Sequence, residues 1–213
     1  MSTPAHLQIA IDGPAASGKT TVALRLAHGL GVLYLDTGAM YRALAYYALR
    51  DGVDADNEGA LLRLWEREGA GWRTLDPELL QSNHVSSVVS TIAAHPAVRE
   101  AMVRSQRAIA AEGPVVMAGR DIGTVVLPFA HVKIFLTASV QARVKRRLAQ
   151  LEAAGEHVPP LQLAAEIEER DRLDRERPVS PLVPAPDAHE LDSSELGIDE
   201  VVAKIVGIVE RVK

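Results

Sequence analysis

The chain has 213 residues, of which 47% are hydrophobic, enough to bury the core of one full domain. Its net charge of −5 argues against general nucleic-acid binding, and the absence of cysteine excludes disulfides, thiolate metal sites and cysteine nucleophiles. No apolar stretch reaches the roughly 20 residues of a membrane span, and residues 1–6 lack the features of a signal peptide. We therefore expect a cytoplasmic protein that binds neither nucleic acid nor membrane.

Apolar runs alternate with helical patterns along the chain, which predicts an α/β fold with a parallel sheet. The strands are expected at Leu7–Asp12, Val32–Asp36, Val115–Ala118, Lys133–Leu136 and His189–Leu191. The helices are expected at Lys19–Leu30, Ala39–Arg50, Asn57–Arg67, Asn83–Ala93, Pro96–Ala111, Val140–Ala153, Leu161–Arg175 and Ile198–Val212. Two stretches with glycine and proline, Glu68–Leu80 and Ala154–Pro160, are predicted to be loops or lids, which often carry function in α/β proteins.

The first expected strand runs into GPAASGKT, which fits the phosphate-binding loop pattern G-x-x-x-x-G-K-[ST] at every fixed position. Its glycines let backbone N–H groups surround a phosphate at a helix N-terminus. Lys19 would add charge near the β- and γ-phosphates, and the Thr20 hydroxyl is placed to bind Mg²⁺. The alternative is a glycine-rich turn that only joins strand to helix. The predicted triphosphate-binding residues are Gly13, Pro14, Ala15, Ala16, Ser17, Gly18, Lys19, Thr20 and Thr21.

Two more motifs directly follow expected strands, so both should lie at the carboxyl edge of the sheet, where open α/β sheets bind ligands. In Leu35–Arg42 (LDTGAMYR), small residues allow close backbone approach and Arg42 can form a fork onto a phosphate. In Gly119–Thr124 (GRDIGT), Arg120 and Asp121 present a cation beside an anion. The alternatives are a helix cap with an exposed arginine for the first motif and a structural salt bridge for the second.

The last motif is the arginine-rich run ERDRLDRERP. On a helix, Arg170, Asp174 and Arg177 share one face, while Arg172 and Arg175 lie on a different one. Two basic faces could therefore hold two phosphate groups. The ordinary alternative is a solvated helix with salt bridges. If Arg177 is an exposed charge, its truncation should leave thermal stability nearly unchanged.

Taken together, these motifs resemble those of bacterial cytidylate kinases. The resemblance runs from about Ile9 to the C-terminus and rests on GPAASGKTT, LDTGAMYR, PAVR, GRDIGTVV, the arginine-rich run and PLVP. It implies that Mg²⁺ and ATP serve the phosphorylation of CMP or dCMP, a step of pyrimidine nucleotide metabolism. The implied fold is the P-loop NTPase nucleoside-monophosphate-kinase fold, a parallel five-stranded sheet flanked by helices with a lid and a shortened monophosphate-binding insert.

The resemblance also implies a division of the chain and roles for its residues. A single, monomeric kinase domain would have a core (1–67, 81–153 and 178–213), an insert at about 68–80 and a lid at about 154–177. The triphosphate-binding residues above would bind ATP, and the catalytic residues would be Lys19, Arg120 and Arg177. The CMP site would comprise Thr37, Tyr41, Arg42, Ser90, Arg99, Arg120, Asp121, Arg170, Asp174 and Arg177.

Within that site, Ser90, Arg99 and Asp121 would hold the cytosine, because an ionised Asp121 can only accept hydrogen bonds and suits the cytosine amino group. Arg42 and Arg120 would bind the CMP phosphate. That phosphate is already an anion, so the reaction needs alignment and charge neutralisation rather than a general base. A lid would keep water out.

Three arginines, Arg143, Arg146 and Arg147, are further candidates for ATP contacts, and their spacing leaves open which of them points inward. The chain departs from the family in the stretch Glu68–Leu80, which is short for the insert, and in Gln81, which stands where arginine is common. Shikimate and adenylate kinases would share the loop and lid but not LDTGAMYR or GRDIGTVV. A GTPase-like switch would require N-K-x-D, which the chain lacks.

Overall fold

The computed structural model describes residues 6–153 and 155–212, and the chain divides into two compact units. The first, which we call the α/β unit, comprises the chain up to Leu35 together with everything from Glu112 onward. The second, the helical unit, is Asp36–Ala111. No helix in the described ranges combines the length and apolarity needed to cross a membrane.

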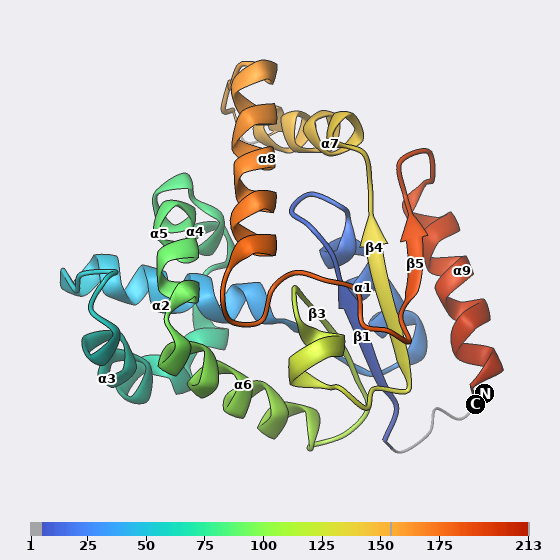
Figure 1. Ribbon diagram of the computed structural model, residues 1–213, viewed down its shortest axis with the longest axis horizontal. Coiled ribbons are helices and arrows are strands. Elements are labelled where there is room, and N and C mark those ends of the chain that lie inside the picture. Colours follow the sequence, from blue (N-terminus) through green and yellow to red (C-terminus); the bar gives the residue numbers. More distant parts are fainter. Residues whose placement is uncertain (1–5, 154, 213) are drawn as a thin grey trace. The chain divides into compact units, whose positions relative to one another are not determined.

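A five-stranded sheet forms the centre of the α/β unit, in the order β2-β3-β1-β4-β5 (Figure 1). The strands are β1 (Gln8–Asp12), β2 (Leu33–Asp36), β3 (Val115–Gly119), β4 (Val132–Thr137) and β5 (His189–Asp192). β1 pairs in parallel with β3 and β4, so that Ala10 lies opposite Met117 and Lys133, and β4 pairs in parallel with β5. Each strand lies within one residue of its predicted bounds. The central strands β1, β3 and β4 are buried and mostly apolar, as is typical of parallel sheets.

The α-helices described in this unit are α1 (Lys19–Leu30), α7 (Val140–Ala153), α8 (Pro160–Glu176) and α9 (Ile198–Arg211). α1 and α9 pack together and share a core with the strands that includes Ile11, Leu26, Ile134 and Ile205. α7 and α8 pack against each other around a separate cluster of Leu151, Leu163 and Ile167. In Figure 1, α7 continues from the carboxyl end of β4, and α8 lies beside it.

The helical unit consists of α2 (Thr37–Asp51), α3 (Glu58–Glu68), the 3₁₀ turn η1 (Gly69–Thr74), α4 (Pro77–Gln81), α5 (Asn83–Ala94) and α6 (Pro96–Ala110). α2 packs against α3 and α5, and its Met40 and Leu44 are fully buried with Leu61, Ile92 and Met102. These apolar residues recur at helical spacing, which is why α2, α3, α5 and α6 were predictable.

Two local structures differ from the expectation. Glu68–Leu80 is mostly helical rather than a loop, since Asp76 accepts a hydrogen bond from Glu78 N and Pro77 occupies the first turn of α4. A π-helical turn, η2 (Ile122–Val126), follows β3 and was not expected. The other predicted loop is confirmed for residues 155–159, whereas Ala154 lies outside the described residues. The division into core, insert and lid stays a prediction.

Candidate active site

The phosphate-binding loop lies between the end of β1 and the start of α1. A Cβ on Gly13 would lie 2.1 Å from the carbonyl oxygen of Leu136 in β4, so only glycine fits there. Ala16 has a φ of 57°, in the left-handed region that a residue with a side chain rarely adopts. Gly18 precedes α1, whose first backbone N–H groups favour an anion. The loop therefore has one defined, strained shape.

Three carbonyl groups of this loop accept hydrogen bonds from cationic side chains. The pairs are Lys19 Nζ to Pro14 O (2.9 Å), Arg143 Nη1 to Ala15 O (3.3 Å) and Arg146 Nη1 to Ser17 O (3.2 Å). Carbonyl and N–H point in opposite directions across a trans peptide, so these bonds turn the loop's N–H groups the other way. Of the three candidate arginines, Arg143 and Arg146 contact the loop, whereas Arg147 donates to Gln150 on the surface.

Asp12, at the end of β1, connects the phosphate-binding loop to the motif after β3. Its carboxylate accepts hydrogen bonds from Ile122 N (2.8 Å) and Gly123 N (2.7 Å). Burial raises the pKa of Asp12 to about 6, an effect that these two bonds and the Lys19 charge oppose and the Asp121 charge reinforces. The sequence analysis did not identify Asp12, although an acidic residue at the end of a buried strand, directly before the loop, was a usable signal.

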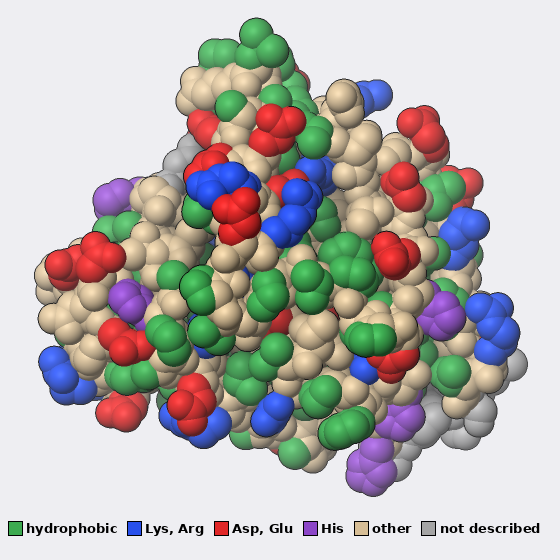
Figure 2. All heavy atoms as spheres, in the orientation of Figure 1, with side chains coloured by type: hydrophobic (Ala, Val, Ile, Leu, Met, Phe, Trp, Pro, Cys, Tyr) green, Lys and Arg blue, Asp and Glu red, His purple; other side chains and the backbone are tan. Residues whose placement is uncertain are grey.

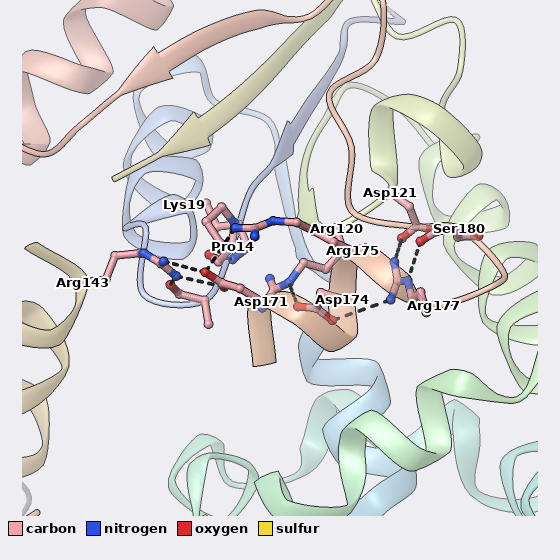
Figure 3. A network of polar contacts seen from close by, with 11 residues as sticks. Pro14, Lys19, Arg120, Asp121, Arg143, Asp171, Asp174, Arg175, Arg177 and Ser180 are labelled. Atoms are coloured by element: carbon pink, nitrogen blue, oxygen red, sulfur yellow. Dashed lines mark hydrogen bonds and ion pairs between the residues drawn. The ribbon is translucent and has the colours of Figure 1, made fainter. Parts of the chain in front are cut away.

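Arg120, Asp121, Asp174 and Arg177 lie together in the α/β unit (Figure 3). Arg120 Nε donates to Asp174 at 2.7 Å, and Arg177 lies 3.8 Å from Asp121 and 4.0 Å from Asp174. Burial favours a higher pKa for Asp174, but the charge and hydrogen bond of Arg120 and the charges of Arg170 and Arg177 hold that pKa below its usual value. The predicted face of α8 is thus a compact cluster of alternating charges.

Arg177 is not the exposed charge that the stability expectation assumed. Its side chain is 11% exposed, and its Nε donates to the carbonyl oxygen of Ser180. The premise is wrong because the chain turns back after α8 and covers this side chain, which helical spacing alone does not reveal.

The other face of α8 matches the salt-bridge alternative. Arg172 pairs with Glu169 and Glu176, and Arg175 lies 3.6 Å from Asp171, with both arginines more than half exposed. Figure 2 shows basic and acidic side chains intermingled over α8. The face with Arg170, Asp174 and Arg177 stays the predicted phosphate-binding face.

In the helical unit, Arg42 is held by an acidic partner that the sequence analysis did not assign. Arg42 Nη2 donates to Asp36 Oδ2 at 2.9 Å, and Asp36 makes no capping hydrogen bond to α2. A Cβ on Gly38 would lie 2.8 Å from Arg42 Nη1, so glycine gives the guanidinium its room. The helix-cap alternative for this motif is therefore wrong.

The four other predicted CMP residues of this unit lie on α2, α5 and α6. Arg99 is buried, with its guanidinium 5.8 Å from the centre of the Tyr41 ring, and its Nη1 donates to Ala93 O at 3.4 Å. Thr37 begins α2 and is buried, and Ser90 is half-buried on α5. The roles of all these residues stay predictions.

The comparisons with known proteins agree with these motifs. The family model described as cytidylate kinase matches residues 9–211. The chain is 49% identical to the cytidylate kinase of Anoxybacillus flavithermus, with 96% of each chain covered. It is 50% identical to that of Pelotomaculum thermopropionicum, with 94% of this chain and 95% of the relative covered.

Among solved structures, shikimate kinase from Acinetobacter baumannii in complex with shikimate matches with a TM-score of 0.50 and 18% identity, covering 97% of this chain and 94% of that one. This likeness shows the fold alone, a parallel sheet flanked by helices as in P-loop nucleoside-monophosphate kinases. Sequence identity of about one half to two cytidylate kinases, over nearly the whole length, identifies the family more specifically than the shared fold does. On that ground, this chain belongs to the cytidylate kinase family.

Proposed function

We propose that this protein transfers the γ-phosphoryl group of ATP to CMP or dCMP and releases ADP with CDP or dCDP. The observation that carries the proposal is the match to the cytidylate kinase family over residues 9–211. Every fixed position of the phosphate-binding loop is present, and the loop carbonyls are held by Lys19, Arg143 and Arg146.

ATP would bind through the backbone and side chains of residues 13–21. Among the described residues, no group of three acidic, histidine or cysteine side chains could hold a metal ion. Mg²⁺ can instead arrive bound to ATP, because it keeps several waters and phosphate oxygens as ligands and needs only one or two ligands from the protein. The exposed Thr20, directly after Lys19, would supply its hydroxyl.

For the acceptor, we assign the cytosine to Ser90, Arg99 and Asp121 and the phosphate to Arg42 and Arg120. This assignment is supported by hydrogen bonds that orient two of the arginines within their own units. Arg42 donates to Asp36, and Arg120 donates to Asp174. The remaining assigned residues, in contact with the ribose and phosphates, are Thr37, Tyr41, Arg170, Asp174 and Arg177.

The chemistry asks little of these residues beyond alignment. The acceptor phosphate is an anion and needs no base, so Lys19, Arg120 and Arg177 would serve by neutralising charge on the transferring group. We also propose that the enzyme is a cytoplasmic monomer, as expected from the sequence. Sedimentation at micromolar concentration tests the oligomeric state.

A coupled assay of ADP release tests the function directly. ATP is supplied with CMP, dCMP, UMP, AMP or shikimate, and ATP alone gives the background hydrolysis. We expect rapid turnover with CMP and dCMP only. Turnover with shikimate or AMP instead, or no turnover with CMP, would contradict the proposal.

A further inference from the structure

A buried ion pair joins α7 to α8 beside the phosphate-binding loop. Arg143 Nη1 and Nη2 donate to the two carboxylate oxygens of Asp171 at 3.0 and 2.5 Å, and both side chains are less than 5% exposed. Arg143 Nε also donates to Ala138 O at 3.1 Å, and its Nη1 reaches Ala15 O. Figure 3 shows Arg143 and Asp171 facing each other beside Pro14.

Stability alone is a weak explanation for this pair. Removing two charges from water costs free energy that their attraction often fails to recover, and apolar replacements of buried ion pairs are often neutral or stabilising. A directed fork between a guanidinium and a carboxylate instead gives orientation. Arg143 and Asp171 each contact a different part of the site, and the pair can orient both parts.

On one side, Arg143 orients the peptide between Ala15 and Ala16. Its bond to Ala15 O fixes this carbonyl and so directs the N–H of Ala16, which belongs to the same trans peptide. Ala16 has the left-handed φ of 57°, a conformation that persists only where neighbours enforce it. In loops of this pattern the backbone N–H groups are the phosphate ligands.

On the other side, Asp171 fixes the end of α8 that carries the charged cluster. It directly follows Arg170 and lies one helical turn before Asp174. The apolar contacts between α7 and α8 are made by Leu151, Leu163 and Ile167, and Val144, directly after Arg143, packs against the same cluster. Apolar contacts are non-directional, so the orientation of this end of α8 depends on directed contacts. The Arg143–Asp171 pair supplies the one to α7, beside the hydrogen bond from Arg120 to Asp174.

We propose that Arg143 and Asp171 are positioning residues for phosphoryl transfer, joining the phosphate-binding loop to the face of α8 with Arg170, Asp174 and Arg177. The part that concerns α8 rests on the proposed function, whereas the part that concerns the loop depends only on ATP binding.

The test uses a double variant, Arg143→Met with Asp171→Leu, which removes both buried charges and replaces them with apolar groups of similar length. Asp171→Asn is the single variant that leaves the Arg143 charge without its ionic partner. Glu169→Gln is the matched control, because it breaks an exposed ion pair on the same helix. Urea unfolding gives stability, calorimetry gives the Kd for ATP without acceptor, and steady-state kinetics gives kcat and KM.

We expect the double variant to be as stable as the wild type but to bind ATP about 10-fold more weakly and to lose about 10²-fold in kcat, as for a misplaced reacting group. KM for CMP should change less than kcat. Asp171→Asn should lose both stability and kcat, and Glu169→Gln should match the wild type in all measurements.

A stable double variant with wild-type Kd for ATP and wild-type kcat would overturn the proposal, since the pair would then be only structural. If the wild type fails to phosphorylate CMP, the proposed function fails on its own, and the ATP dissociation constants still decide whether Arg143 positions the loop. An unchanged Kd in the double variant would then overturn the inference.

Discussion

At the scale of single residues, the α/β unit uses buried charges to hold backbone groups in place. Lys19 donates to Pro14 O, Arg143 to Ala15 O, and Asp12 accepts from the backbone of η2. The contacts of Arg143 and Asp12 join segments that lie more than a hundred residues apart in the sequence. A variant at such a position will therefore change both a charge and a backbone conformation.

Lys19→Ala should lower kcat by about 10²-fold or more, because it removes a charge that neutralises the transferring phosphoryl group. Loss of the bond to Pro14 O should also weaken ATP binding, since it frees a loop carbonyl. Steady-state kinetics with circular dichroism as the folding control checks this. A variant with most of its kcat would remove Lys19 from the mechanism.

Asp12 should make stability depend on pH in an unusual direction. Its pKa rises from 3.8 to about 6 on folding, so between these values the folded protein keeps a proton that the unfolded chain has lost. The contribution of Asp12 to the free energy of unfolding must then fall by about 3 kcal/mol as pH rises from about 4 to 6, for a pKa shift of about two units. Above pH 6 the contribution stays at this lower value.

Asp12→Asn removes this titration but keeps the side chain's size. Urea unfolding of both proteins between pH 4 and 7 should show the wild type losing stability relative to the variant as pH rises. One bond to the η2 backbone is lost in the variant at every pH, which shifts its curve uniformly. Parallel pH profiles for the two proteins would contradict the raised pKa.

Arg177→Ala should cost both stability and activity. Its side chain is largely buried between Asp121 and Asp174, and truncation leaves those carboxylates with less compensation, at about 1–3 kcal/mol. We expect kcat/KM for CMP to fall about 10²-fold. Arg172→Ala is the matched control on α8, where an exposed charge should cost under about 0.5 kcal/mol and leave kinetics unchanged. Identical behaviour of the two variants would return this helix to its salt-bridge interpretation.

At the scale of elements, the central sheet was predictable because β1, β3 and β4 are short, mostly apolar and buried runs. The short helix α4 was not predictable, because Pro77, which begins it, also occurs in loops, and Gly69 and Gly71 in the same stretch favoured a loop. The π-helical turn η2 depends on Asp12, more than a hundred residues earlier, which accepts its N–H groups. Pairings over such separations leave no periodic pattern in a single sequence.

The candidate site was predictable to the same extent. Its motifs could be found at the ends of strands, since they follow apolar runs, but the partners of their charges could not. Asp171 lies in the predicted arginine-rich run, yet only packing of α7 against α8 brings it to Arg143. The same holds for Arg177, whose burial depends on the chain after α8.

The first turn of α2 offers a prediction at this scale. Gly38→Ala should displace the Arg42 guanidinium, because the new Cβ would lie 2.8 Å from Nη1 and 3.1 Å from Asp36 Oδ1. KM for CMP should rise about 10-fold, as expected for the loss of one charge-assisted contact, while KM for ATP stays constant. Stability should not fall, because alanine is the better helix former.

Gly207→Ala in α9 is the matched control, since a Cβ there meets nothing within 4 Å. It should stabilise the protein by about 1 kcal/mol and leave both KM values unchanged. An unchanged KM for CMP in Gly38→Ala would show that Arg42 does not contact the acceptor.

At the scale of the whole molecule, the chain combines an α/β unit that carries the phosphate-binding loop with a helical unit that carries Arg42 and Arg99. The family relationship covers both units, because the matched residues 9–211 include all of Asp36–Ala111. Selectivity for the base is therefore a property to be tested on the full chain and not on either unit alone.

Asp121 is the residue on which base selectivity should depend most. An ionised carboxylate accepts from the amino group of cytosine and repels the carbonyl oxygen that uracil has in its place, so kcat/KM for CMP should exceed that for UMP by on the order of 10⁴. Asp121→Asn supplies an amide donor at the same position. It should lower kcat/KM for CMP and raise it for UMP, reducing the ratio at least about 100-fold. Competition of the two nucleotides in one ATP-coupled assay measures that ratio directly, with Glu169→Gln as the control for a lost surface carboxylate. A ratio that stays at the wild-type value in Asp121→Asn would assign base recognition to other groups, foremost Arg99 and Ser90.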